Sequence, residues 1–290
     1  MKWNWIKFLN AIAEIFRDYN KRELVRTLPP RMRTKLILTI WRRSQLADNW
    51  TELVGGFDAV SIKCADRDHL FAKDDAPAMA HQAREAGLEV HGWGFHYCEA
   101  PGAALEEARA AAEGARSIGA VAYHWNAEKQ WFNSPMPAQS AIEFALEFKQ
   151  KAPGVKLYAN CFRRGVTEEF NEYFDFIEPM CYGTKAATIA SKINNRMTSW
   201  SEVPTEKVGW MVGTGRMNGE TQAWGYFETD SQDVPGLLEL AMKHRPTSIN
   251  FFRAGVADGE DIMVSSNKFN PTLADQAKRL RAELSKLRLV

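Results

Sequence analysis

Hydrophobic and polar positions follow one repeated theme from about residue 35 onward. A short run of β-branched and aromatic residues is followed by a polar loop and then by an Ala-, Leu- and Glu-rich stretch with helical spacing. This alternation predicts βα units around a parallel sheet. The predicted strands are Lys35–Trp41, Ala59–Cys64, Leu88–Phe95, Ala120–Glu128, Val155–Phe162, Phe174–Tyr182, Lys207–Thr214 and Ser248–Arg253. Eight such strands favour an α/β fold, a (β/α)8 TIM barrel, with a doubly wound open sheet as the competing architecture.

The expected helices between these strands end at glycines. Gly87, Gly119 and Gly154 each stand at or just before the start of a predicted strand, where a residue that tolerates positive φ ends a helix. This punctuation supports separate βα units.

Both ends of the chain carry one apolar stripe with helical spacing. The first stripe is Trp5, Phe8, Ile12, Ile15 and Tyr19, and the second is Leu273, Ala277, Leu280, Leu284 and Leu287. We therefore expect an added N-terminal amphipathic helix within an extension of residues 1–34, and a barrel domain over 35–290 that includes a C-terminal helix. Each end helix covers either the barrel wall or the other end of the chain.

Charge is distributed unevenly between these two parts. Residues 1–35 hold nine Lys and Arg against three acidic residues, a net charge of +6; the whole chain carries +1, so the remainder carries −5. A basic helix rich in Trp and Phe is also typical of an anchor, so residues 1–25 are a candidate for contact with a membrane surface or an assembly partner. Nucleic-acid binding is not expected, because no recognisable reading module accompanies the basic residues.

Composition excludes several classes of protein. Of 290 residues, 45% are hydrophobic and 25% charged, which are ordinary globular values and exclude a disordered, collagenous or disulfide-scaffold chain. Four singly placed cysteines indicate free thiols.

With no secretory signal visible, we expect synthesis in the cytoplasm, with release by lysis or carriage in a particle as the routes outward. Neither HExxH nor a strand-one H-x-H is present, so we expect no metal and no cofactor.

The densest group of candidate functional residues is the fourth predicted strand. Its side chains alternate between two faces, so His124, Asn126 and Glu128 share the face that points into a barrel. Burial without partners would cost each polar group about 1–3 kcal/mol, so this row is either a satisfied network or a site. Glu128 ends the strand, where barrel enzymes place catalytic groups.

Other strand ends supply candidate substrate-binding residues. Flat aromatic rings suit stacking on the apolar faces of sugars, and polar groups orient a ligand. The candidates are Trp41, Lys63, Asp66, Trp93, His96, Trp131 and Asn160, together with His124. Tyr182 is the candidate for holding a substrate amide or the oxygen at the reaction centre.

Several of these runs resemble barrels of glycoside hydrolases. VSIKCAD (60–66), REAG (84–87) and LEVHGWGFHY (88–97) resemble the second and third βα units of family 25, the lysozyme-like barrels. MCY (180–182) is similar to the M-x-Y of family 18 chitinase-like barrels, whose strand-four D-x-D-x-E corresponds here to HWNAE (124–128). The resemblance spans roughly residues 35–255 in layout. It implies cleavage of a β-linked N-acetylhexosamine polymer, peptidoglycan or chitin-like, as by a phage endolysin.

Two departures from those families restrict the mechanism. Asn126 replaces a carboxylate, and strand one ends TIWR (39–42) without an aspartate. In the route we prefer, the substrate's own acetamido oxygen attacks the anomeric carbon, Asn126 orients that amide, and Glu128 is the general acid and base. The other route draws a second carboxylate from Asp66 or Glu99. The alternative function is a catalytically inactive carbohydrate-binding or structural barrel of a phage or bacterial assembly.

Overall fold

The computed structural model describes residues 33–287 apart from 47, 101, 129–130, 132, 135, 162–171, 183–185, 200–202, 214–232, 253–254, 258–266 and 270. The expected helix with the stripe from Trp5 to Tyr19, and the whole of residues 1–25, lie outside the described residues.

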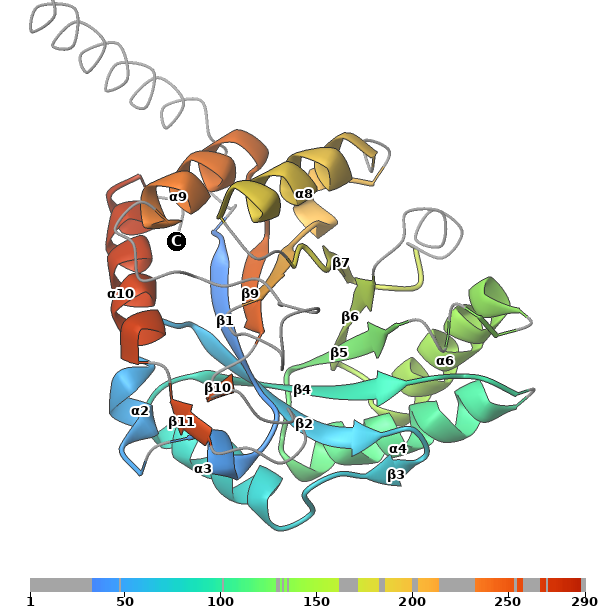
Figure 1. Cartoon of the computed structure of the whole chain (residues 1–290). Helices are drawn as coiled ribbons and strands as arrows, with labels where there is room; N and C mark the ends of the chain where they lie inside the picture. Colours follow the sequence, from blue (N-terminus) through green and yellow to red (C-terminus); the bar gives the residue numbers. More distant parts are fainter. Residues whose placement is uncertain are drawn as a thin grey trace, which may run out of the picture.

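Parallel strands form the centre of the molecule (Figure 1). They are β1 (Lys35–Ile40), β2 (Ala59–Asp66), β4 (Glu89–His96), β5 (Ala122–Ala127), β6 (Lys156–Cys161), β7 (Phe176–Pro179), β8 (Trp210–Gly213) and β9 (Ser248–Phe252). All eight predicted strands are confirmed, with ends that shift by a few residues. The short β3 (His69–Leu70) pairs antiparallel with the end of β2.

The strand order closes the sheet into a barrel. Hydrogen-bonded neighbours follow the order β7-β6-β5-β4-β2-β1-β9-β8. The two outer strands of that order meet through isolated parallel bridges, Ile177 with Val208 and Met180 with Met211. The (β/α)8 prediction is therefore confirmed over the open-sheet alternative.

Helices cover the outside of the barrel (Figure 1). They are α2 (Trp50–Leu53), α3 (Asp75–Glu85), α4 (Ala103–Ser117), α6 (Pro137–Lys151), α8 (Ala186–Ser199), α9 (Asp233–His244) and α10 (Pro271–Lys286), with 3-10 turns at Arg43–Gln45 and Thr205–Lys207. A small antiparallel pair, β10 (Gly255–Ala257) and β11 (Asn267–Phe269), lies apart from the barrel sheet. Gly87, Gly119 and Gly154 have φ of 78°, 60° and 88°, as their expected helix-ending role requires.

Small residues allow α4 to approach the barrel closely. Ala108, Ala111 and Ala115 of this helix are fully buried. A Cβ added at Gly114 would lie 2.7 Å from the backbone oxygen of Cys64 on β2. The alanine-rich sequence thus determines how near the helix lies to the strand.

The C-terminal stripe packs on the barrel wall as predicted. Ala277, Leu280 and Leu284 of α10 are buried. A Cβ at Gly56, after α2, would lie 2.5 Å from the backbone nitrogen of Lys278, so the two backbones touch there. The four cysteines are buried and free, as expected.

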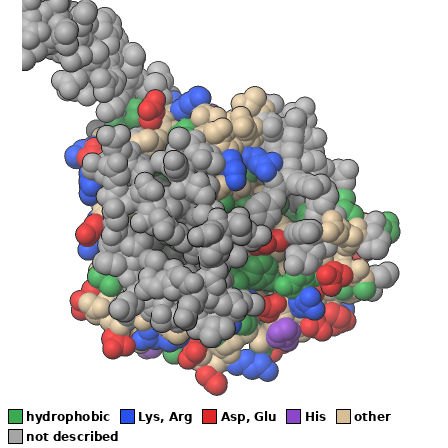
Figure 2. Space-filling view, in the orientation of Figure 1, with side chains coloured by type: hydrophobic (Ala, Val, Ile, Leu, Met, Phe, Trp, Pro, Cys, Tyr) green, Lys and Arg blue, Asp and Glu red, His purple; other side chains and the backbone are tan. Residues whose placement is uncertain are grey.

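The visible surface mixes both signs of charge. In Figure 2, described acidic and basic side chains are interspersed along the rim of the molecule rather than gathered into one field. Among the described helices, none combines the length and the apolar character that crossing a membrane requires.

Candidate active site

A carboxylate and a carboxamide meet at the carboxyl end of β5. Glu128 directly follows the last residue of the strand, and its side chain is half-buried. Asn126 Nδ2 donates a hydrogen bond to Glu128 Oε1 at 3.1 Å. Burial raises the pKa of Glu128 to about 7, and the hydrogen bond from Asn126 opposes the rise. Near neutral pH the group is therefore populated in both protonation states, as a general acid and base must be.

A second carboxamide lies beside the first. Asn160 of β6 is in register with Asn126 of β5, and both side chains are buried. Asn160 Nδ2 lies 3.1 Å from Met211 Sδ. The Oδ1 atoms of both residues have no hydrogen-bond partner among the described residues. Because an unpartnered buried acceptor costs about 1–3 kcal/mol, these two oxygens are suited to receive N–H or O–H groups of a ligand.

Tyr182 lies close enough to Glu128 for the charge of the carboxylate to act on its hydroxyl. Burial raises the pKa of the Tyr182 hydroxyl, and the negative charge of Glu128 raises it further. The hydroxyl contacts Met211 Sδ at 3.0 Å. The structure therefore brings Tyr182, Asn126 and Glu128 together at one end of the barrel.

An aromatic cage holds a buried ammonium next to these groups. Lys63 is 1% exposed, and its Nζ lies 2.5 Å from Asp66 Oδ2. Ring centroids surround the nitrogen at 4.3 to 5.4 Å, in the order Phe71, Trp41, Phe95 and Trp93. Burial lowers the pKa of Lys63, and the Asp66 carboxylate opposes that shift. The cage stabilises the cation through ring faces and one ion pair.

A bulge explains why Lys63 and Asp66 share a face at a spacing of three. The register of β2 against β4 shifts between Lys63 and Ala65, so Lys63 pairs with Trp93 and Asp66 with Phe95. Asp66 is thus committed to an ion pair.

Glu99, the other expected source of a second carboxylate, is an exposed rim residue. Its Oε2 lies 3.9 Å from the Arg67 guanidinium, and about half of its side chain is exposed. Asp66 is held in its ion pair with Lys63, and Glu99 is exposed, so neither carboxylate is bonded to Glu128. The group that is hydrogen-bonded to Glu128 is the amide of Asn126.

Of the candidate stacking residues, Trp41 keeps the most accessible ring. It is half-buried and meets Trp93 edge-on, with centroids 5.6 Å apart. Trp93 is buried, and its Nε1 donates to the Ile40 carbonyl oxygen. Trp93 therefore forms part of the floor, and Trp41 lies nearer the opening.

Two expected substrate contacts lie on the outer side of the barrel wall. Trp131 is 2% exposed; its ring packs against Trp125 at 4.9 Å, and its Nε1 donates to the Pro137 carbonyl oxygen. His96 is hydrogen-bonded to the Tyr123 hydroxyl at 2.7 Å and lies 3.3 Å from Glu107 of α4. The alternation that points Trp93 inward points His96 outward, so neither His96 nor Trp131 is brought to Glu128.

His124 lies one layer below Asn126, in a network whose other members, His91 and Glu178, the sequence did not identify. Its Nδ1 is 3.0 Å from Glu178 Oε2, and its Nε2 is 3.0 Å from His91 Nδ1. Glu178 of β7 also accepts from Ser248 Oγ at 2.5 Å and Asn250 Nδ2 at 3.1 Å. Burial raises the pKa of Glu178, but His124 and these hydrogen bonds outweigh it and lower the pKa overall.

The network extends to Glu89, whose Oε2 is 3.4 Å from His91 Nε2. The contacts thus run from Glu178 through His124 and His91 to Glu89. Each of the three contacts needs one ring proton, so one of the two rings carries both of its protons. Burial lowers the pKa of His91 to about 4, and both ring nitrogens of His124 have partners in this chain of contacts. His124 is therefore part of a satisfied interior network.

Tyr97 is a further residue at the opening that sequence reasoning missed. Burial raises its pKa, as do the charges of Asp66 and Glu128. The Arg67 guanidinium carbon lies 4.1 Å from its ring centroid. The signal was present, because Tyr97 directly follows β4 and continues the inward series of Trp93 and Phe95.

A metal site would need several ligating side chains close together in the described part of the chain. No cluster of three or more His, Cys, Asp or Glu side chains there has the proximity to hold an ion. The chemistry available to these residues is proton transfer by Glu128, orientation by amides and stacking by aromatic rings.

Comparisons with known proteins show likeness in structure. No protein-family model and no curated protein matches the sequence. A chitinase from Rhizomucor miehei matches with a TM-score of 0.61 and 9% identity, over 85% of this chain and 100% of that one. The Bacillus cereus spore cortex-lytic enzyme SleL matches with 0.61 and 10%, over 87% and 75%. A family GH18 chitinase from Cycas revoluta matches with 0.61 and 9%, over 88% and 99%. The chain therefore has the barrel fold that these glycoside hydrolases share.

Proposed function

We propose that this protein is a glycoside hydrolase that cleaves a β-linked N-acetylhexosamine polymer of the chitin or peptidoglycan kind. The observation that carries the proposal is the Glu128 carboxyl at the end of β5, with its pKa raised to about 7 and an amide, Asn126, bonded to it. Similar structures are chitinases and a spore cortex-lytic enzyme, which supports this substrate class.

The reaction is assisted by the substrate. Glu128 protonates the glycosidic oxygen while the substrate's acetamido oxygen attacks the anomeric carbon, so the glycosidic bond breaks as an oxazolinium ion forms. Asn126 Oδ1, which has no partner among the described residues, accepts the acetamido N–H and holds that oxygen in line. The Glu128 carboxylate then takes a proton from the water that opens the ring, which restores the starting state.

Asn126 also explains how the site works without a second carboxylate. A neutral carboxamide orients the acetamido group but gives less stabilisation to the positive ion than a carboxylate would. We therefore expect a slow hydrolase with a preference for substrates that carry the N-acetyl group.

The test compares Glu128→Gln with wild type on chito-oligosaccharides and purified peptidoglycan, with reducing-end release as the readout. Loss of the acid and base should reduce the rate at least 100-fold. Glu99→Gln, at an exposed rim position, is the matched control and should retain wild-type rates. Equal release by wild type and Glu128→Gln would refute the assignment.

A second candidate is a non-catalytic carbohydrate-binding or structural barrel, and the neutral Asn126 next to Glu128 is the observation that favours it. Binding of the same oligosaccharides by wild type and Glu128→Gln, without release by either, would select this candidate.

We also propose that residues 1–25 attach the barrel to a membrane surface or an assembly partner, on the support of their apolar stripe and basic charge. Deleting residues 1–25 should abolish association with anionic vesicles or particles while the barrel stays folded. Retained association would refute this attachment. Release by lysis or carriage in a particle is our proposed route to an outside polymer.

A further inference from the structure

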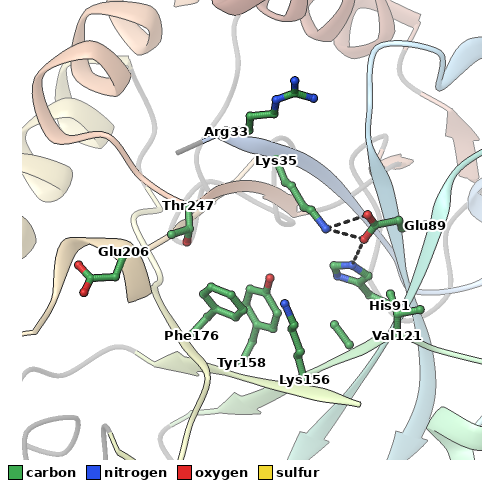
Figure 3. Close-up of a pocket in the computed structure, with 11 residues that line it drawn as sticks. Arg33, Lys35, Glu89, His91, Val121, Lys156, Tyr158, Phe176, Glu206 and Thr247 are labelled. Carbon is green, nitrogen blue, oxygen red and sulfur yellow. Dashed lines mark hydrogen bonds and ion pairs between the residues drawn. The ribbon is translucent and has the colours of Figure 1, made fainter. Parts of the chain in front are cut away.

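A cavity lies at the opposite end of the barrel from Glu128. It has a volume of about 570 Å³ and opens among the first residues of β1, β4, β5, β6 and β7 (Figure 3). Because the strands are parallel, this amino-terminal end is separated from the site by the length of the barrel. The volume falls within the range of about 300–1,000 Å³ that is common for small-molecule sites.

Lys35 and Glu89 form an ion pair on one wall of this cavity. Lys35 Nζ lies 2.8 and 2.6 Å from the two carboxylate oxygens of Glu89. The hydrogen bond from His91, together with Lys35, lowers the pKa of Glu89 to about 2. Figure 3 shows these three side chains joined on one side of the cavity. They therefore add no net charge to attract a ligand.

Positive charge remains on the other walls. Arg33 and Lys156 line the cavity, against the single remaining carboxylate of Glu206. Glu206 is exposed and lies across the cavity from Lys156 in Figure 3. Lys156 is exposed, and its Nζ lies 5.5 Å from the ring centroid of Phe176. The ammonium of Lys156 thus faces the cavity without a carboxylate partner among the described residues.

Two residues with hydroxyl groups, Tyr158 and Thr247, also line this space. Tyr158 is only 4% exposed, and its side-chain contacts are with rings: His91, His124 and Phe176. Figure 3 shows Tyr158 and Lys156 among the side chains that line the cavity. Thr247 Oγ1 is buried and has no hydrogen-bond partner among the described residues. Burial raises the pKa of Tyr158, and so do the charges of Glu178, Glu89 and Asp175, of which only Glu89 lines the cavity, so the hydroxyl stays a donor.

Three hydrogen-bond donors, from Lys156, Tyr158 and Thr247, line this end of the barrel. Residues at the amino-terminal face ordinarily serve stability, and the buried Thr247 hydroxyl would serve it better with a hydrogen-bond partner. An ammonium and two hydroxyls that converge on one cavity match the acceptor oxygens of an anion. The stacked rings of Tyr158 and Phe176, with centroids 4.5 Å apart, add an apolar wall that suits a ligand larger than a bare ion.

We propose that this cavity binds a small organic oxyanion, a phosphate ester or carboxylate of about monosaccharide size, through Lys156, Tyr158 and Thr247. The site is separate from the proposed hydrolase centre, and the proposal does not depend on the hydrolase activity.

The test is calorimetric titration of the full chain with glucose 6-phosphate, glucuronate and inorganic phosphate, with glucose as the neutral control. We expect saturable binding of at least one organic anion and none of glucose. A response to glucose 6-phosphate alone would identify the ligand as a phosphate ester, and a response to glucuronate alone would identify it as a carboxylate. Absence of saturable binding for both organic anions would overturn the proposal.

Variants assign the binding to this cavity. Lys156→Gln should weaken affinity about tenfold or more, because a charged hydrogen-bond donor is lost. Tyr158→Phe keeps the ring stack and should weaken affinity severalfold. Lys278→Gln, at an exposed position on α10, is the matched control. Glu128→Gln should bind as wild type does, and each variant's melting temperature confirms folding. Unchanged affinity in both cavity variants would overturn the assignment.

Discussion

Replacing Glu128 with glutamine should remove a pH-dependent loss of stability as well as activity. The wild-type carboxyl has its pKa raised by burial from 4.5 to about 7. In the unfolded chain it ionises near its ordinary pKa, whereas in the folded protein it resists ionisation until about pH 7. Folding therefore becomes less favourable as the pH rises between these two values, because the unfolded state releases the proton first.

The size of this effect follows from the same shift. One pKa unit corresponds to about 1.4 kcal/mol, so the shift of Glu128 corresponds to about 3 kcal/mol of unfolding free energy lost across the interval. This value is an upper bound, because the half-buried side chain retains some solvent contact. In a chain of this size, about 3 kcal/mol shifts the melting temperature by roughly 6 °C.

Thermal melting across pH measures the difference directly. Glu128→Gln and wild type should differ little at about pH 4.5, and the variant should melt several degrees higher at about pH 8. Glu99→Gln is the control for loss of a charge, and its curve should run parallel to that of wild type. A constant difference between Glu128→Gln and wild type at all pH values would refute the reasoning, because it would show that folding does not change the pKa of the Glu128 carboxyl.

Two further predictions test the mechanism and the packing. If the proposed hydrolysis is correct, Asn126→Asp should raise kcat about tenfold near pH 6, because a carboxylate stabilises the oxazolinium ion better than an amide does. The added negative charge should also move the alkaline limb of the pH profile to higher pH. A fall in kcat measured on chito-oligosaccharides would contradict this prediction. Gly114→Ala should destabilise the fold by about 1–3 kcal/mol, because the new Cβ would lie 2.7 Å from the Cys64 backbone oxygen. Helix propensity alone predicts stabilisation by up to about 1 kcal/mol, so the sign of the change in urea unfolding decides between the two.

The sequence by itself determined the barrel and the face on which the site residues lie. Strand and helix periods are local properties, so each βα unit could be found from its own residues. Alternation placed Asn126 and Glu128 on one face of one strand, and the structure joins them by a hydrogen bond. The C-terminal stripe on α10 likewise identified its buried side.

Only the tertiary structure decided which polar groups are already engaged. Alternation gives the face of a side chain but not its depth in the barrel or its partner, because those depend on the register of distant strands. The bulge in β2 places Asp66 on the same face as Lys63, and the meeting of β5 with β7 across the barrel interior joins His124 to Glu178. The chain between β5 and α6 places Trp131 against Trp125. These contacts connect residues far apart in sequence, so no local pattern contains them.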